Sequence, residues 1–412
     1  MMRHFVTFFL AVLLMASATA QEWIDQRLVL RAGEQLSRFV PLEVPFAWEW
    51  DEGGTIGVRQ PSTGRTFPAQ VRDGVLTFVA EGALPGSEHH YTLVRGPQGR
   101  PPKVRVEPVE GEEALAVYIE DQHFTTYHYA NERDGEVVHK PYLWPVLAGA
   151  AGVPITRAYP MAPTEDGDDD HPHHRSFYTA YGDINGADLW SERDGSGIQS
   201  SQTVTHGSGD AYGWITAQNE WRDADGTPVI DETREYRFYA GPAGTRLFDL
   251  NVTFTASHGP VTFGDTKEGG IAAMRVAHSI RAAGGGTMTT SEGVLVDRTT
   301  PEANIWGKPA AWLDYFGPVD GAGVHGIAIL DHPSNPRHPT RWHARKYGLV
   351  GANIFGLSDF TDGEENGDLE LGEGETLSFQ YRVVVHEGDT EAADIAARYA
   401  DYATSPEVAW ME

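Results

Sequence analysis

Residues 236–254 read YRFYAGPAGTRLFDLNVTF, and this stretch points to the fold class. Its second half alternates polar residues with apolar ones, namely Phe248, Leu250, Val252 and Phe254. Alternation of this period is typical of a strand with one buried face. The intervening Pro242-Ala243-Gly244 is typical of a turn. The stretch therefore predicts two neighbouring antiparallel strands in an all-β protein.

Turn signals and apolar runs elsewhere predict more strands of the same kind. Residues 72–74 and 223–226 combine Asp and Gly in the way that favours hairpins. Further strands are expected over residues 115–120, 212–220, 324–330 and 377–386. The 46 glycines and 25 prolines suit a chain of many short strands joined by turns.

The C-terminal region carries the pattern of an amphipathic helix. Asp389 or Thr390 supplies an N-cap. The apolar residues that follow share one helical face: Ala392, Ile395, Ala396, Tyr399 and Tyr402. We expect this helix to pack against the main sheet and to close it.

Prolines clustered between Pro97 and Pro108 indicate a domain boundary. We expect a small N-terminal β-sandwich over residues 21–104 and a large β-domain with the C-terminal helix over 105–412. A large antiparallel domain is most easily built as a two-sheet sandwich. Such a sandwich is similar to the supersandwich of sugar mutarotases, an analogy of fold alone.

The first twenty residues predict the compartment. Arg3 and His4 precede an apolar run over residues 5–16, and Ala18-Thr19-Ala20 is a small-residue cleavage signal. We therefore expect residues 1–20 to be a signal peptide and the mature protein to be periplasmic or secreted. The apolar run is too short to cross a bilayer, so we expect no membrane insertion.

Charge and cysteine content exclude several classes of function. The chain has 59 acidic and 31 basic residues and a formal net charge of -28. Such a surface repels phosphate backbones, so we expect no nucleic-acid partner. The absence of cysteine excludes disulfides, thiolate nucleophiles and Cys-ligated metal sites.

Side chains able to do chemistry gather in several segments. Residues 170–192 combine three histidines with arginine and several acids, and residues 264–270 place Lys267, one of five lysines, between two acids. Residues 331–343 follow an expected strand and repeat the Asp-His-Pro order of 170–172. Loops at strand ends are where binding and catalytic groups tend to lie. Rim histidines, an ion pair and a stiff proline-rich loop are the structural alternatives.

A weaker fourth segment, residues 123–145, mixes aromatic and polar side chains and includes Lys140. A pyranose ring offers an apolar C–H face and a rim of hydroxyls, so aromatic side chains of this kind suit sugar stacking. They suit the core of a sandwich equally well.

Long strings of the chain resemble a bacterial family of exported proteins of unknown function, which has been labelled methane oxygenase PmoA. The strings are FTTYHYA (124–130), KPYLWPV (140–146), ITRAYPM (155–161), DHPHHRS (170–176), GDINGADLWSE (182–192), FGDTKEGG (263–270), WGKPAAWLDYFGPVDG (306–321) and DHPSNPRHPTRWHARKYGL (331–349). A membrane-bound copper oxygenase subunit needs several transmembrane helices, and none is expected here. The resemblance implies a carbohydrate role instead, because similar proteins occur beside polysaccharide-degrading enzymes.

These observations predict an exported carbohydrate-active enzyme, a glycoside hydrolase or lyase that acts on an oligosaccharide. Glycoside cleavage needs a protonated and an ionised group at the reacting bond. The expected catalytic residues are Asp183, Asp265, Glu268, His174 and His338. The expected substrate-binding residues are His173, Arg175, Asn185, Asp188, Trp190, Lys267, Asn335, Arg337 and His343. Arg175 and Arg337 would clamp a carboxylate if the sugar is a uronate.

Other functions stay open. The cofactor is unknown, either none or a divalent metal, whose ligands would be His171, His173, His338 and His343 with Asp170 or Asp331. A sugar epimerase uses similar groups. A non-catalytic glycan-binding protein is the contrasting class, and Glu268→Gln separates it from an enzyme because only an enzyme loses turnover.

Overall fold

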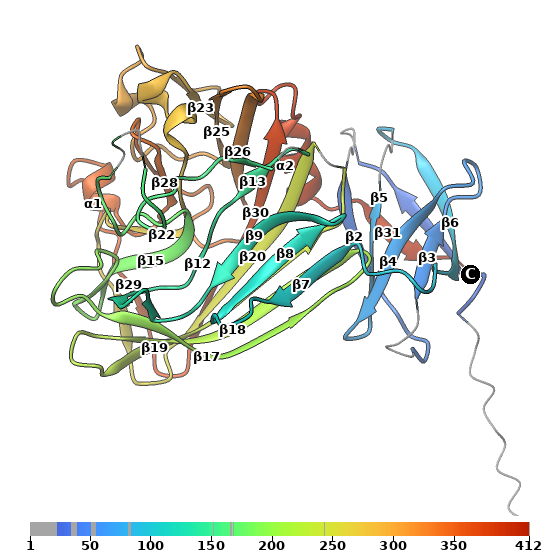
Figure 1. Ribbon diagram of the computed structural model, residues 1–412, viewed down its shortest axis with the longest axis horizontal. Helices are drawn as coiled ribbons and strands as arrows, with labels where there is room; N and C mark the ends of the chain where they lie inside the picture. The colour runs from blue at the N-terminus through green and yellow to red at the C-terminus, as the bar shows by residue number, and fades with distance from the viewer. Residues whose placement is uncertain are drawn as a thin grey trace, which may run out of the picture.

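The computed structural model describes residues 23–33, 39–50, 55–80, 84–150, 152–164, 167, 169–242 and 244–411. The expected signal peptide over residues 1–20 lies outside the described residues. Figure 1 shows two unequal β-domains side by side, the smaller one in blue. No helix among the described residues is long and apolar enough to cross a membrane.

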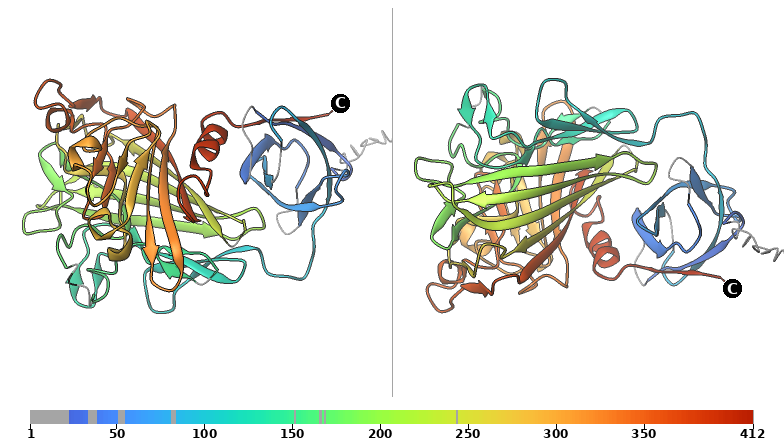
Figure 2. Two further views of the ribbon diagram at one scale, coloured as in Figure 1. Left: turned by 90° about the horizontal axis from the view of Figure 1, so that it is seen from above. Right: turned by 90° about the horizontal axis from the view of Figure 1, so that it is seen from below.

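The small N-terminal β-domain is built on one seven-stranded antiparallel sheet. Its strands, in spatial order, are β2 (Val40–Pro45), β5 (Val75–Ala80), β4 (Thr66–Arg72), β3 (Ile56–Arg59), β6 (Glu88–Arg95), β1 (Arg27–Arg31) and β31 (Glu407–Trp410). The sheet curves around a core of its own, which includes Leu28, Phe78 and Leu93 (Figure 2). The turn expected at residues 72–74 joins β4 to β5.

The large domain is a sandwich of two antiparallel sheets, as predicted. The first runs β27 (Trp342–Ala344), β28 (Leu349–Ala352), β22 (Gly269–Arg275), β15 (Phe177–Ile184), β12 (Tyr142–Leu143), β9 (Gln122–His128), β8 (Ala114–Ile119) and β7 (Val104–Pro108). Three short strands attach to this sheet: β16 (Ala187–Leu189), β21 (Val261–Phe263) and β29 (Leu369–Leu371).

The second sheet holds the longest strands. Its order is β17 (Ile198–Gly207), β18 (Tyr212–Arg222), β19 (Pro228–Tyr239), β20 (Thr245–Thr255), β30 (Thr376–Glu387), β26 (Gly323–Asp331), β25 (Trp312–Val319), β23 (Thr287–Thr290) and β24 (Leu295–Val296). Two small hairpins lie apart, β10 (Glu132–Arg133) with β11 (Glu136–Val137) and β13 (Leu147–Ala148) with β14 (Val153–Pro154). The short helical elements are η1 (His278–Ile280), η2 (Ala282–Gly284), η3 (Glu302–Asn304), α1 (Leu357–Phe360) and α2 (Ile395–Ala403).

β19 and β20 are neighbouring antiparallel strands of the second sheet, as the sequence predicted. Tyr236 pairs with Leu250, and Phe238 pairs with Phe248. The alternating apolar side chains of β20 point into the core between the sheets, where Phe254 contacts Trp221 and Phe263. The other strands expected from the sequence correspond to β8, β18, β26 and β30.

The C-terminal helix is present but begins later than the sequence indicates. Asp389 instead caps a separate turn, in which its carboxylate accepts a hydrogen bond from the Ala392 amide at 2.9 Å. Asp394 then takes a left-handed backbone with φ of 49°, so α2 starts only at Ile395. Thr390 donates its hydroxyl to Asp314 and caps nothing.

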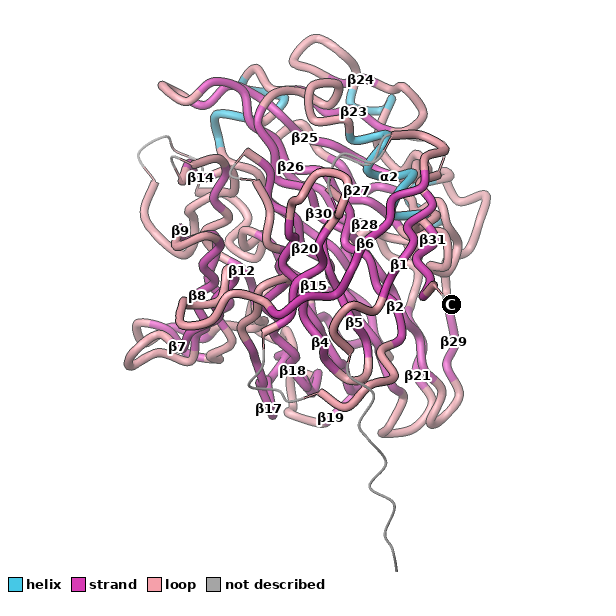
Figure 3. Tube along the Cα trace, turned by 90° about the vertical axis from the view of Figure 1, so that its right-hand side faces the viewer, coloured by secondary structure: helices cyan, strands magenta, loops and turns pink. Residues whose placement is uncertain are grey.

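Helix α2 lies between the two domains (Figure 2). Ile395 and Tyr402 pack in a cluster with Phe39 of the small domain and Leu330 of the large one. The chain then returns to the small domain, where β31 pairs with β1 (Figure 3). Residues 407–410, which we had assigned to the large domain, thus complete the small sheet.

Candidate functional site

A cavity of about 680 Å³ lies against the first sheet of the large domain, where its lining includes Gly182 of β15 and His343 of β27. Four loops line it, from residues far apart in the sequence. They supply His171, Pro172, His173, His174, Gly182, Asp188, Trp190, Ser191, Glu192, Arg193, Thr266, Lys267, Glu268, His343, Arg345 and Tyr347. The fold therefore brings the first two predicted segments together with the end of the third.

Aromatic rings form the walls and floor of this cavity. His171, His174 and Tyr347 lie parallel, with ring centroids 4.9 Å apart for His171 and His174 and 5.2 Å for His171 and Tyr347. The ring of His173 meets His174 edge-on at 4.2 Å, and Trp190 lies 5.4 Å from His174. Flat rings of this kind offer the apolar surface on which a sugar ring can lie.

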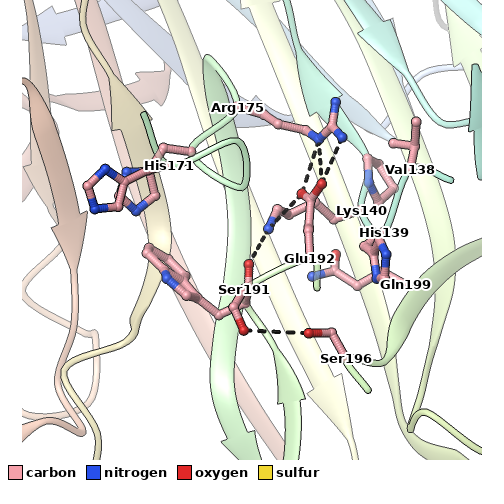
Figure 4. Close-up of polar contacts among 12 residues, drawn as sticks. Val138, His139, Lys140, His171, Arg175, Ser191, Glu192, Ser196 and Gln199 are labelled. Atoms are coloured by element: carbon pink, nitrogen blue, oxygen red, sulfur yellow. Dashed lines mark hydrogen bonds and ion pairs between the residues drawn. The ribbon is translucent and has the colours of Figure 1, made fainter. Parts of the chain in front are cut away.

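A buried ion cluster supports the floor. Glu192 accepts hydrogen bonds from Arg175, at 2.7 Å for Nη2, and its Oε1 lies 2.9 Å from Lys140 Nζ (Figure 4). Lys140 also donates to the Trp190 carbonyl at 2.7 Å. Burial by itself would raise the pKa of Glu192, but Lys140 and Arg175 outweigh it and lower that pKa. The carboxylate is therefore ionised, and it fixes the loop that carries Trp190.

A second ion network holds His171 at the mouth of the cavity. Its Nδ1 lies 2.9 Å from Asp170 Oδ2, while Asp170 Oδ1 accepts from Arg157 at 2.8 Å and from Arg275 at 2.7 Å. Despite the opposing effect of burial, Arg275 and His171 lower the pKa of Asp170. An ionised Asp170 favours the proton of His171 on Nδ1, which leaves Nε2 as an acceptor. His171 has a left-handed backbone with φ of 44°, an uncommon conformation for such a residue.

The inner imidazoles are held in their neutral form. Burial, with the charge of Lys140 nearby, lowers the pKa of His173 to about 3. Burial and then Arg345 lower the pKa of His343 to about 3. The pKa of His174 is also well below its usual value, chiefly because of burial. Neutral imidazoles at pH 7 donate and accept hydrogen bonds but are poor bases.

Several polar nitrogens of the floor lack a protein partner. Trp190 Nε1 and His343 Nδ1 are buried without a hydrogen bond among the described residues. His174 Nδ1 accepts from Arg275 at 3.3 Å, so the proton of this ring lies on Nε2. Buried polar groups are normally paired, and those left unpaired call for an explanation such as a ligand or an ordered water.

An exposed ion pair lies at the rim. Lys267 Nζ is 2.5 Å from Glu268 Oε1, and the two side chains are 33% and 43% exposed. The backbone of the loop that carries them is held by Asn353, which donates to the carbonyls of Thr266 and Lys267. Glu268 is thus the accessible carboxylate that the predicted catalytic set contributes to the cavity.

Other residues of the first two segments support loops outside the cavity. Asp183 accepts from the Gly186 amide, and Asn185 bridges to residues 260 and 262. Asp265 accepts from the amides of Ser358 and Gly367. Asp188 does line the cavity, but its Oδ1 caps the amides of Trp190 and Ser191. Arg175 reaches the site only through Glu192.

The third segment divides between two places. His343 reaches the cavity, whereas residues 331–338 form a loop near α2. There His338 Nδ1 lies 2.7 Å from Asp331 Oδ2, and its Nε2 lies 3.3 Å from the Tyr399 hydroxyl. Asn335 bonds Asp331 and the backbone of Gln380. Arg337 donates to the carbonyls of residues 354, 367 and 368.

This division separates the alternative metal ligands. His171, His173 and His343 line the cavity, but His338 is bonded elsewhere. Among the described residues, the group able to gather three metal-ligand atoms is Glu220, Asp231 and His258, on the other sheet. Arg222 also pairs with Glu220, which leaves that group as an ordinary surface ion network.

Sequence reasoning missed three contributors to the site. Lys140 lies in the weak fourth segment, and nothing in its neighbourhood indicates a partner fifty residues away. Glu192 ends the first segment, and nothing in the sequence distinguishes it from the other acidic residues there. Tyr347 lies beyond the third segment. The scarcity of lysine was the one signal that could have selected Lys140.

Comparison with known protein families gives the relationship of the chain. A family described as a family of unknown function (DUF6807) matches residues 114–400. The chain belongs to this family. DUF6807 here spans the large domain from β8 to α2, including every loop that lines the cavity. The match carries neither an activity nor the methane oxygenase label. No curated protein matches the sequence.

Proposed function

We propose that this DUF6807 protein is a carbohydrate-active enzyme, a glycoside hydrolase or lyase that takes an oligosaccharide into the cavity of His171 and Trp190. The observation that carries the proposal is the floor of the cavity. Trp190 Nε1 and His343 Nδ1 lie there without hydrogen-bond partners among the described residues, beside the flat ring of His174. Such a surface matches a sugar, which has apolar faces and a hydroxyl rim.

Two accessible groups supply acid–base chemistry in this proposal. His171 is the base, because Asp170 orients its ring through Nδ1 and leaves Nε2 free to accept a proton. Glu268 is the second group, and it lies at the rim 2.5 Å from Lys267 Nζ. The inner imidazoles have the role of positioning hydroxyls, since their neutral form serves as donor or acceptor without taking up a proton.

The test is mass spectrometry of plant and algal oligosaccharides incubated with the protein, with and without a chelator. Fragments that sum to the parent plus one water establish hydrolysis, and fragments that sum to the parent establish a lyase. Glu268→Gln is expected to lower turnover at least 100-fold while ligand still binds. Glu370→Gln, on exposed β29, is the matched control and keeps full turnover. Binding without products from any sugar would instead indicate a glycan-binding protein.

We also propose export, on the strength of residues 1–20. N-terminal sequencing of the protein recovered from the periplasm or the medium is expected to begin at Gln21. Recovery of the full chain in the cytoplasm alone would contradict this part of the proposal.

A further inference from the structure

The charges around the cavity differ from those of the chain as a whole. Acids outnumber bases by 59 to 31 over the full sequence. The described charged residues that line the cavity are balanced, with Arg193, Lys267 and Arg345 against Asp188, Glu192 and Glu268. Two further cations, Lys140 and Arg175, lie behind the lining around Glu192.

The deepest of these charges are the least balanced. Lys140 and Arg175 share the single carboxylate of Glu192, and the three side chains are 1%, 11% and 5% exposed. Burying a cation away from water is unfavourable unless an anion offsets it. Lys140 Nζ lies 5.8 Å from the centre of the Trp190 ring, directly behind the floor. An anion placed on the floor would therefore gain from this buried positive charge.

The floor also presents donors rather than acceptors to such a group. Trp190 Nε1–H is donor only and has no partner among the described residues. His174 carries its proton on Nε2, because Nδ1 accepts from Arg275. His173 makes no hydrogen bond to a described residue, and its low pKa agrees with a site of positive potential. Two N–H groups near one another and a buried cation match the oxygens of an oxyanion.

We propose that the substrate is an anionic sugar, whose carboxylate or sulfate group binds the donors of Trp190 and His174 over the Lys140–Arg175 pair. This inference rests on the proposed function only in taking a sugar as the ligand. It replaces the clamp expected from Arg175 and Arg337, since Arg175 is held by Glu192 and Arg337 by backbone carbonyls.

Calorimetry with three matched oligosaccharide sets tests the proposal. One set contains uronate oligomers, the second contains the same oligomers with their carboxyl groups reduced to alcohols, and the third contains sulfated oligomers. We expect a uronate or a sulfated oligomer to bind at least tenfold more tightly than neutral sugars, and less tightly as salt is raised. A carboxylate and a sulfate are distinguished by which set binds. Equal or tighter binding of neutral oligomers, or no binding of either acidic set, overturns the inference.

A pair of lysine variants makes the test specific. Lys267 and Lys103 each lie 2.5 Å from a glutamate and have side chains 33% and 32% exposed. Lys267→Met leaves Glu268 unpaired at the rim and is expected to weaken binding of the acidic oligomer about tenfold. Lys103 lies in the groove between the domains, and Lys103→Met is expected to change the affinity for the acidic oligomer less than twofold. Equal effects of the two variants would contradict a local anion site.

Turnover measured on the same sugars separates this inference from the proposed function. An acidic oligosaccharide that binds but yields no product overturns the enzymatic function and leaves the anionic ligand in place. Cleavage confined to neutral oligosaccharides overturns the anionic ligand and leaves the enzyme.

Discussion

Two loops of this protein share the order Asp-His-Pro, at residues 170–172 and 331–333, and differ in what their polar atoms contact. The first loop places His171 at a cavity whose floor contains nitrogens of Trp190 and His343 that have no hydrogen-bond partner in the described part of the chain. The second directs Asp331 to Asn335, Thr340 and His338, and all of these partners belong to the protein. Density of polar residues is therefore a weaker sign of a site than polar atoms without partners.

The largest expected effect is a loss of stability when the carboxylate that holds each loop in place is removed. Glu192→Gln leaves Lys140 and Arg175 buried without a counter-ion, and we expect it to lower the free energy of unfolding by about 3–5 kcal/mol. Asp331→Asn disturbs hydrogen bonds only, so its effect should be about 1–3 kcal/mol. Urea unfolding of both variants measures the difference. A larger loss of stability from Asp331→Asn than from Glu192→Gln would contradict this prediction.

Catalysis distinguishes the two histidines of the repeated motif. His171→Asn removes the acceptor at the cavity and is expected to lower turnover at least 100-fold. His332→Asn is the matched control, because His332 packs edge-on against Tyr402 near α2 and should leave turnover within twofold. The comparison uses initial rates on whichever oligosaccharide is cleaved. Equal losses would show that the first loop has no special role.

The pH dependence of stability should follow the buried imidazoles of the cavity, of which His343 is one. The pKa of His343 is about 3 when folded and 6.5 when unfolded, so below pH 6.5 the unfolded chain binds more protons. The contribution of the neutral His343 ring to the free energy of unfolding is fully present above pH 6.5. It is lost as the pH falls, by about 2 kcal/mol at pH 5. Asp331 has the opposite effect on stability, because burial raises its pKa and a lower pH therefore favours the folded state of the protein.

Urea midpoints measured between pH 5 and 8 check this prediction. His343→Asn is expected to reduce the loss of stability between pH 7 and pH 5, whereas Asp331→Asn should not reduce it. A variant at His343 that keeps the full slope would show that other groups cause it.

The smallest expected effect is the difference between an indole N–H that donates to a protein carbonyl and one that has no partner among the described residues. Trp190→Phe and Trp342→Phe both shrink a side chain that is at most 1% exposed, so both should lose stability through the cavity left behind. Trp190 Nε1 has no partner among the described residues, whereas Trp342 Nε1 donates to the Ala310 carbonyl at 3.0 Å, so Trp342→Phe should lose about 1 kcal/mol more. Only Trp190→Phe should lower the affinity for the sugar, by about tenfold. Calorimetry measures the affinity of the two variants for the sugar, and urea unfolding measures their stability.

Much of the fold could be predicted because strand alternation is a local signal. The run from Phe248 to Phe254 shows its buried face directly, and the turns at residues 72–74 and 223–226 fix the neighbouring strands. The start of α2 could not be predicted, since the local pattern reveals neither the bond of Thr390 to the distant Asp314 nor the left-handed backbone of Asp394. The return of residues 407–410 to the small sheet is a long-range pairing that no local pattern reveals.

The candidate site was predictable only in part for a similar reason. Composition selected the loops of His171–His174 and Lys267–Glu268, which the fold does bring together. It could not separate them from the loop of Asn335 and His338, because both are equally rich in polar residues. What distinguishes the two is the pairing of individual atoms, and that depends on residues such as Lys140 and Glu192, which lie fifty positions apart.

The return of β31 to the small sheet has a consequence for the order of assembly. β1 lies between β6 and β31, so during synthesis it has one neighbour until residues 407–410 emerge. The large domain can complete both of its sheets before then, whereas the small domain waits with an open edge that other chains could pair with. A chain ending at residue 404 should therefore retain the cavity and yet associate through β1. The C-terminal strand thereby covers β1 and becomes the edge strand itself, with Trp410 packed against Phe46 and Trp48.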